Sequence, residues 1–386
     1  MLKGLFYLCL GLLSLGQFSA IHKFGTSNLY LFDIAVAGFA FLGLVYFFSI
    51  RKIKITKSFL FLFFFTFVAI CSLVFNSYKL SLADLQVSVF YLARWFVYLV
   101  AGLVVFNMAE KKLIDHNQIL TAFFLSGLFV AFAGFIQLMV LPDFTVLDAT
   151  LGWDPHKNRL ASTFFDPNFT GAYLIICLCA GLARRNRITA GTHTGKIMAI
   201  GFGTLLLAIF LTFSRSSWLM LGVTLGVYGA YMNRKLLFFA FLIAALAYFA
   251  VPRVQTRISG ITDNADSAHF RLISWSNAVS IFKNNWLLGV GFNTYRYVQQ
   301  EYRFTEVGET GGNSGAGADS SFLLVLATTG VLGALFFSGG YFTSSLKQKN
   351  LLFNALFLGL FVSAAFINAL FYPQILFAWL ILKNCF

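Results

Sequence analysis

Apolar runs long enough to cross a membrane follow one another along almost the whole chain. A helix of about 20 apolar residues spans the hydrocarbon core of a bilayer. Of the 386 residues, 59% are hydrophobic and only 11% are charged, a balance that excludes an ordinary soluble protein. The sequence therefore predicts an all-α, polytopic membrane protein, which we expect to form a single membrane domain over residues 1–386.

The apolar runs predict about twelve transmembrane helices. The first run follows Lys3 and resembles a signal peptide, but the spans that come directly after it favour a retained helix. The last run is short for a full crossing. The expected spans are Leu5–Ile21, Leu29–Ile50, Ser58–Phe75, Val87–Phe106, Gln118–Leu141, Phe169–Ala183, Ile197–Phe213, Ser217–Met232, Leu236–Val251, Ser320–Tyr341, Leu351–Phe371 and Gln374–Leu382.

One long polar segment, residues 252–319, interrupts the apolar pattern. An unpaired charge in hydrocarbon costs roughly 3 kcal/mol or more, so we expect this arginine-containing segment to be a loop outside the bilayer. Within it, apolar residues at helical spacing predict a short amphipathic helix on the membrane domain, with Asp266 and Ser267 as caps. These apolar residues are Leu272, Trp275, Val279 and Phe282.

Lysine and arginine are distributed unevenly between the two sides of the predicted bundle. With the N-terminus in the cytoplasm, the even-numbered loops face inward and carry most of these residues, as the positive-inside rule requires. The inward basic positions fall within residues 51–57, 111–112, 184–196, 234–235 and 347–349. Topology thus explains much of the net charge of +14, so we expect no nucleic-acid partner and an extracytoplasmic loop 252–319.

Five arginines on the outward side are not explained by topology. They are Arg159, Arg215, Arg253, Arg257 and Arg271. Guanidinium groups bind phosphate in a bidentate fashion, so a shared phosphate or headgroup is one explanation. The other is that they are unrelated surface or snorkelling side chains.

Two of these arginines stand beside residues suited to a polar pocket. Arg159 precedes an Asp-Pro-Asn sequence that ends at Asn168 and favours a turn followed by a helix start. Asn168 is either a substrate-binding residue or a plain N-cap. Arg215 lies in a serine-rich turn, residues 214–217, between two spans, which places it at the outer membrane surface.

The long loop offers further candidates. Arg271 lies in the first turn of the predicted amphipathic helix, close to His269, which is either an acid–base group or a surface histidine. The glycine-rich segment 310–318 is expected to open for a bulky substrate. Asp319 follows it as the last acid before a span, and its alternative role is that of an N-cap.

No cofactor signature accompanies these residues. The sequence has no Walker-type glycine loop, no dinucleotide fingerprint and no histidine/glutamate cluster with metal-ligand spacing. The five cysteines show no disulfide or metal pattern. The sequence therefore predicts no cofactor and no metal ion.

Together these stretches resemble the O-antigen ligase and O-antigen polymerase superfamily of bacterial envelope assembly. The resemblance consists of an Arg–Thr-Phe–Asn stretch before a span, a Ser-Arg turn, a loop Arg followed by Trp and a Gly-Val-Gly turn, and a final span with a Thr-Gly-x-x-Gly-like element. In this chain they are Arg159 to Asn168, Ser214-Arg215, Arg271 with Trp275 and residues 289–291, and Thr329 to Gly333. The resemblance covers about residues 155–340.

The resemblance implies a metal-independent glycosyltransferase at the outer face of the bacterial plasma (inner) membrane, surrounded by membrane lipids. Its donor would be a glycan on a polyprenyl pyrophosphate. Its acceptor would be a hydroxyl of lipid A-core or of a second lipid-linked glycan.

The resemblance also implies roles for single residues. Arg215 and Arg271 would clamp the pyrophosphate and stabilise the charge that develops on the leaving group. Asp319 would orient or deprotonate the acceptor hydroxyl. Ligases of the family usually carry a His-Asn pair where this chain has Asp319-Ser320, which shifts the expectation towards a polymerase. Additional substrate-binding candidates are Arg159, Asn168 and His269.

Two other functions stay open: a flippase for lipid-linked oligosaccharides, and a non-catalytic component of an envelope-synthesis complex. A transporter lines its spans with charge at mid-membrane depth. In this sequence Arg94 is the charge that clearly lies deep, and we expect it to pair with Asp33 or Asp84 in a structural role.

Overall fold

The structure is a computed structural model that describes residues 1–25, 27–147, 153–185, 193–232, 234–260, 267–304, 317–345 and 350–386. The predicted helix cap Asp266 lies outside the described residues. So does most of the glycine-rich segment 310–318, which was predicted to open.

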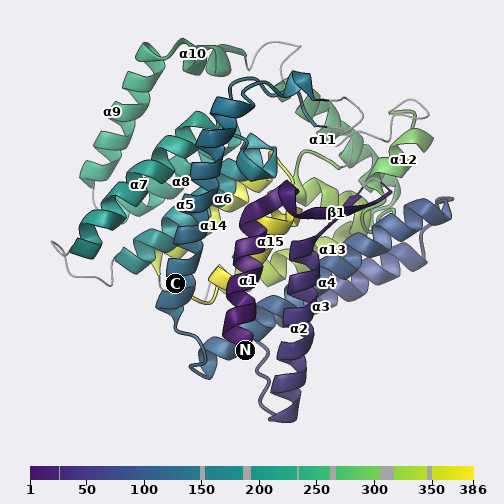
Figure 1. Cartoon of the computed structure of the whole chain (residues 1–386). Coiled ribbons are helices and arrows are strands. Elements are labelled where there is room, and N and C mark those ends of the chain that lie inside the picture. Colours follow the sequence, from purple (N-terminus) through teal and green to yellow (C-terminus); the bar gives the residue numbers. More distant parts are fainter. Residues whose placement is uncertain are drawn as a thin grey trace.

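Helices make up most of the described chain (Figure 1). Six of them are long and apolar enough to cross a membrane, namely α1 with its 3-10 extension, α2, α3, α4, α5 and α13. The helices are α1 (Leu2–Leu15), α2 (Leu31–Ser49), α3 (Lys57–Val74), α4 (Leu82–Glu110), α5 (His116–Val140), α6 (Pro167–Arg185), α7 (His193–Leu211), α8 (Arg215–Met232), α9 (Arg234–Ala250), α10 (Pro252–Ser259), α11 (Ser267–Asn284), α12 (Tyr295–Glu301), α13 (Ser321–Ser345), α14 (Leu351–Ala364) and α15 (Pro373–Leu382).

These helices confirm the prediction of an all-α membrane protein. A helix occupies each of the predicted spans, and one hydrophobic cluster extends from α1 to α15. The helices at the other predicted spans fall short of the length or apolarity of the six. The number of crossings therefore stays a prediction.

The first predicted span ends earlier than expected. Gly16 has a φ of 52°, a left-handed conformation that glycine adopts readily and that ends a helix. The chain then forms a two-stranded antiparallel sheet from β1 (Ala20–Phe24) and β2 (Ser27–Tyr30). The apolar pattern of the sequence did not predict this hairpin.

The C-terminal helices also differ from the prediction. The span expected to reach Phe371 ends at Ala364, and the chain continues into a 3-10 turn (Ala369–Phe371). Pro373 then occupies the first turn of α15, where its missing N–H costs nothing. Every residue of α15 from Gln374 to Leu382 is buried, so this short helix forms part of the centre of the bundle.

The described helices of the polar segment gather at one end of the bundle. Figure 1 shows α10 and α11 at the top and α12 at the upper right, whereas the N-terminus lies in the lower half. The predicted amphipathic helix is present as α11, which packs against α13. Its buried face contains Ala278 and Ile281, but Leu272, predicted to belong to that face, is 59% exposed. The burial against α13 begins one turn later than the hydrophobic pattern indicates.

A break in α13 is closed by the segment that follows α11. Gly330 has a φ of 64° and a ψ of −167° inside the helix, so the helical hydrogen bonds cannot continue through it. Residues 286–291 lie against this break and bond to it: the N–H groups of Val290 and Gly291 donate to the carbonyls of Ala327 and Thr328, both at 3.0 Å, and that of Val331 donates to Trp286 at 2.8 Å. These bonds satisfy backbone groups that lipid could not.

The deep arginine of α4 is paired. Nη2 of Arg94 donates to a carboxylate oxygen of Asp33 at 2.7 Å, and the hydroxyl of Tyr98 donates to the other oxygen at 2.5 Å. Arg94 and Asp33 are each 8% exposed. The predicted pairing is confirmed, with Asp33 rather than Asp84 as the partner.

Replacing Asp33 by asparagine is expected to lower the free energy of unfolding by about 3–5 kcal/mol, because it leaves a buried guanidinium without a countercharge. The measurement is thermal or denaturant unfolding of the purified protein in detergent. Lys54→Ala provides the control, because Lys54 and Glu110 form a pair whose side chains are 64% and 42% exposed, and such pairs contribute about 0–1 kcal/mol. Equal effects of the two substitutions would contradict the structural role.

Candidate active site

Three helices begin at the end of the bundle that carries α10 and α11: α6 at Pro167, α8 at Arg215 and α13 at Ser321. Their starts are linked, because Asn168 accepts a hydrogen bond from Ser214 at 2.8 Å. Asp166 lies just before α6, and its charge raises the pKa of Asp319, which lies just before α13. Helix N-termini carry partial positive charge and free N–H groups, so this meeting point favours anions.

Arg159 is buried at the centre of this region, with 8% of its surface exposed. Its Nε donates to the carbonyl of Thr212 at 2.9 Å, and its Nη2 donates to Oδ1 of Asn168 at 3.3 Å. Its Nη1 lies 3.3 Å from Nδ1 of His156. The guanidinium is therefore held by the end of α7 and the start of α6.

Other arginines lie close enough to act on Arg159. The pKa of Arg159 is lowered to about 9, first by burial and then by the charges of neighbouring arginines, while Asp166 opposes the shift. The arginines that act on it are Arg257, Arg253 and Arg271. Positive groups held together against their repulsion favour a multiply charged anion.

Arg215 belongs to the same end of the bundle. Its Nη1 donates to the carbonyl of Arg257 at 3.3 Å, and Nε of Arg257 donates to the carbonyl of Phe213 at 3.3 Å. Arg253 lies over the Phe213 ring at 4.5 Å and donates to the carbonyl of Asn158 at 2.7 Å. Helix α10 is thereby held over the turn between α7 and α8, and Arg215, Arg253 and Arg257 lie together at this end of the bundle.

Asn168 connects two of the predicted stretches and is not the cap of α6. Asp166 has the capping role, because its Oδ1 accepts from the N–H of Asn168 at 2.6 Å and of Phe169 at 3.3 Å. The side chain of Asn168 instead joins Arg159 to Ser214. Ser214 is buried, as a polar pocket requires.

Asp319 is fixed by its backbone. Its N–H donates to Oγ of Ser274 at 3.1 Å, and its carbonyl accepts from Nε1 of Trp275 at 3.0 Å. Its carboxylate makes no hydrogen bond with a described residue. Burial raises the pKa of Asp319, while the Arg271 charge lowers it, so the carboxylate lies near that guanidinium. Ser320, not Asp319, accepts from the helical N–H of Leu323, at 3.4 Å.

His269 makes no contact with these arginines or with Asp319 among the described residues. It is exposed, and its ring contact is with the adjacent Phe270, at 6.4 Å between centroids. Its predicted role in substrate binding stays a prediction without a supporting contact among the described residues.

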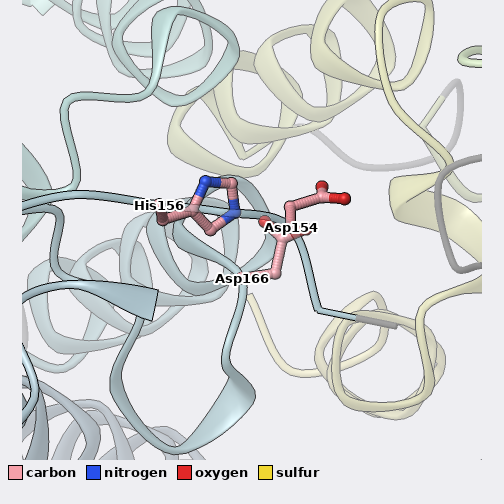
Figure 2. A group of neighbouring side chains, drawn as sticks. All are labelled: Asp154, His156 and Asp166. Carbon is pink, nitrogen blue, oxygen red and sulfur yellow. The ribbon is translucent and has the colours of Figure 1, made fainter. Parts of the chain in front are cut away.

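Sequence reasoning missed three side chains beside the arginines: Asp154, His156 and Asp166. Figure 2 shows the three side chains next to one another. One ligand atom of each lies within 4.8 Å of the others. The available signal was the short Asp-x-His spacing, but the third member comes from the start of α6, and only the folded chain brings it there.

These three side chains are of types that bind metal ions, but one contact opposes a metal. Because arginine is always a donor, Nδ1 of His156 accepts from Arg159, and the neutral ring carries its proton on Nε2. A metal-bound histidine normally donates its other N–H to a carboxylate or carbonyl. Burial, with Arg159 and Arg257, lowers the pKa of His156 to about 4 although Asp166 raises it, so the ring is neutral at pH 7.

A groove of about 780 Å³ lies elsewhere, between α1 and α5. Its lining includes Tyr7, Ser14 and Phe129 along the helices, and Asp115 and Arg184 at one end. None of the arginines described above lines it, so it is not part of the candidate active site.

Comparison with known protein families finds a match that overlaps the candidate active site. Residues 200–338 match the family model described as O-antigen ligase, a range that includes Arg215, Arg271 and Asp319 but begins after Arg159. No curated protein matches the chain. This match over residues 200–338 supports the resemblance of the chain to the O-antigen ligase and polymerase superfamily.

Proposed function

We propose that the protein is a membrane glycosyltransferase of cell-surface polysaccharide assembly. It transfers a glycan from a polyprenyl-pyrophosphate donor to a hydroxyl group of an acceptor sugar. The observation that carries this proposal is the meeting of arginines from separate segments next to one carboxylate. The segments are the loop before α6, the start of α8, and helices α10 and α11.

The arginines are suited to the pyrophosphate of the donor. Arg215 and Arg271 are proposed to clamp it, with Arg159 as a third, buried donor. A guanidinium binds phosphate oxygens in a bidentate fashion and stays charged when partly buried. These groups supply the positive charge that a metal ion supplies in other enzymes, so we propose a metal-independent reaction.

Asp319 is proposed to act on the acceptor. The acceptor hydroxyl oxygen attacks the anomeric carbon of the donor sugar and passes its proton to the Asp319 carboxylate. The bond between that carbon and the pyrophosphate oxygen breaks, and the polyprenyl pyrophosphate leaves with the electron pair. Negative charge develops on the leaving group, where Arg215 and Arg271 stabilise it.

The acceptor and the location are part of the same proposal. We propose that the site faces the outside of the plasma membrane, because the opposite end carries most of the lysines and arginines of the short loops. Aspartate at position 319 in place of the usual histidine favours a polymerase, whose acceptor is a second lipid-linked glycan. Lipid A-core is the acceptor in the ligase alternative.

The test is a transfer assay with purified protein in proteoliposomes. The expected result is an elongated glycan and released polyprenyl pyrophosphate, without ATP or added metal ion. Movement of the donor across the bilayer without a new glycan would identify a flippase. If neither product nor movement occurs in the presence of donor and both acceptors, the protein is a non-catalytic component.

A further inference from the structure

A cluster of three polar side chains lies beside the arginines and has no part in the proposed transfer step. Asp154, His156 and Asp166 each present an atom within 4.8 Å of the others, and Nε2 of His156 is buried without a hydrogen-bond partner among the described residues. A buried donor is rarely left unpaired, because its desolvation is not compensated. No hydrogen bond joins Nε2 of His156 to either carboxylate among the described residues.

The hydrogen-bonding pattern selects the kind of oxygen. The Nε2–H of His156 needs an acceptor, whereas the Asp154 carboxylate and the Asp166 oxygen that does not cap α6 can accept from a donor. A hydroxyl group offers both, because its oxygen accepts from the imidazole and its hydrogen is donated to a carboxylate. A phosphate oxygen would be repelled by the carboxylates, and a metal ion would meet the Nε2 proton.

Aromatic rings stand beside this group, as they do in many sugar-binding sites. Trp153 and Phe165 precede the two aspartates in the chain and contact each other edge-to-face at 5.3 Å. Phe144 lies 5.5 Å from Phe165 and 6.2 Å from the His156 ring. Rings of this kind offer flat apolar surface to the C–H face of a sugar, while neighbouring polar groups bind its hydroxyls.

We propose that Asp154, His156 and Asp166 form the subsite that binds a hydroxyl group of the acceptor sugar. This inference rests on the proposed function and adds to it the residues that hold the acceptor. The subsite is placed for that task, because Asp154 lies within electrostatic reach of Asp319 and Arg159. A sugar bound there has its neighbouring hydroxyls close to Asp319 and to the donor's pyrophosphate.

The test measures the binding of acceptor and donor separately. The probes are the lipid A-core oligosaccharide and the lipid-linked repeat unit, titrated into the full-length protein in detergent. Asp154→Asn and His156→Gln are each expected to weaken acceptor binding, and to raise the acceptor KM, about tenfold or more. In Asp154→Asn the donor KM is expected to stay unchanged, a split that a merely structural role would not produce.

Asp143→Asn is the matched control. Asp143 lies in the same loop and forms an exposed ion pair with Lys157 at 3.2 Å, and asparagine can still accept from Thr145. Unchanged acceptor binding in the Asp154 and His156 variants, with normal thermal stability, would overturn the subsite. Loss of wild-type activity in EDTA that a divalent ion restores would replace it with a metal site. Acceptor binding is measured without donor, so a failure of the proposed transfer leaves this result readable.

The pH dependence gives a further readout. Burial and the charges of Asp166 and Asp319 raise the pKa of Asp154 to about 6, with Arg159 opposing. A carboxyl accepts the hydroxyl hydrogen fully only when deprotonated, so the acceptor KM is expected to rise as the pH falls through about 6. Asp154→Asn should have a higher acceptor KM that no longer changes in this range; an unchanged profile would contradict the role of Asp154.

Discussion

Replacing Arg271 or Arg215 by alanine is expected to reduce glycan transfer by about 100-fold or more. Each guanidinium is proposed to meet the charge that develops on the pyrophosphate as the glycosidic bond breaks. The loss should therefore appear mainly in kcat, with a smaller rise in the donor KM. The measurement is the initial rate of transfer by purified protein at saturating acceptor, over a series of donor concentrations.

Lys283→Ala is the control for Arg271→Ala. Lys283 is exposed in the last turn of the same helix, α11. Its replacement by alanine removes a positive charge far from the site. Arg271→Lys and Arg215→Lys should recover only part of the rate, because lysine keeps the charge but not the bidentate geometry. Wild-type rates in both alanine variants, at normal expression and stability, would remove the pyrophosphate clamp.

Replacing Asp319 by asparagine is expected to lower kcat by about 100-fold or more while donor binding stays within a few-fold of the wild type. Asparagine is nearly isosteric, and the observed contacts to Ser274 and Trp275 use the Asp319 backbone, so the substitution should leave the loop in place. Turnover and donor equilibrium binding are measured on the same preparation. Equal losses in both would indicate a positional role instead of a base.

Ser320→Ala separates the base from the helix cap. Ser320 accepts the helical N–H of Leu323, so its loss should cost about 1 kcal/mol of stability and little turnover. The pKa of Asp319 is raised by burial and by Asp166, with Arg271 opposing. A base acts when deprotonated, so wild-type kcat should fall as the pH drops through this raised pKa. The asparagine variant should lack that dependence.

Much of the helical framework could be predicted from the sequence, because a membrane span is defined by its own residues. The presence of α8, which begins within the serine-rich stretch 214–217, and the presence of α11 follow from local apolar patterns. The pairing of Arg94 could also be expected, since a charge in lipid requires a partner. The choice of Asp33 over Asp84 could not, because it depends on how α2 and α4 pack.

The candidate site was predictable in part. Arg159, Arg215 and Asp319 stand next to turn or loop signals, and the structure brings them to one end of the bundle. Their chemical roles stay predictions. His156 and Asp154 were missed because their neighbour Asp166 also serves as an ordinary helix cap, and nothing local shows that these side chains meet. The buried face of α11 was misjudged because α13, not the helix itself, determines it.

The closed break in α13 has a mechanical consequence. Residues 286–291 tie the helix that bears Arg271 to the span that begins beside Asp319, so we expect these two to move as a rigid wall. The opposite wall is α10, which joins α9 through a 96° bend, and α9 packs mainly on α8 and α10. A long lipid-borne polymer should therefore enter and leave by displacement of α9 and α10. Asp319 and Arg271 would keep their positions relative to each other during this movement.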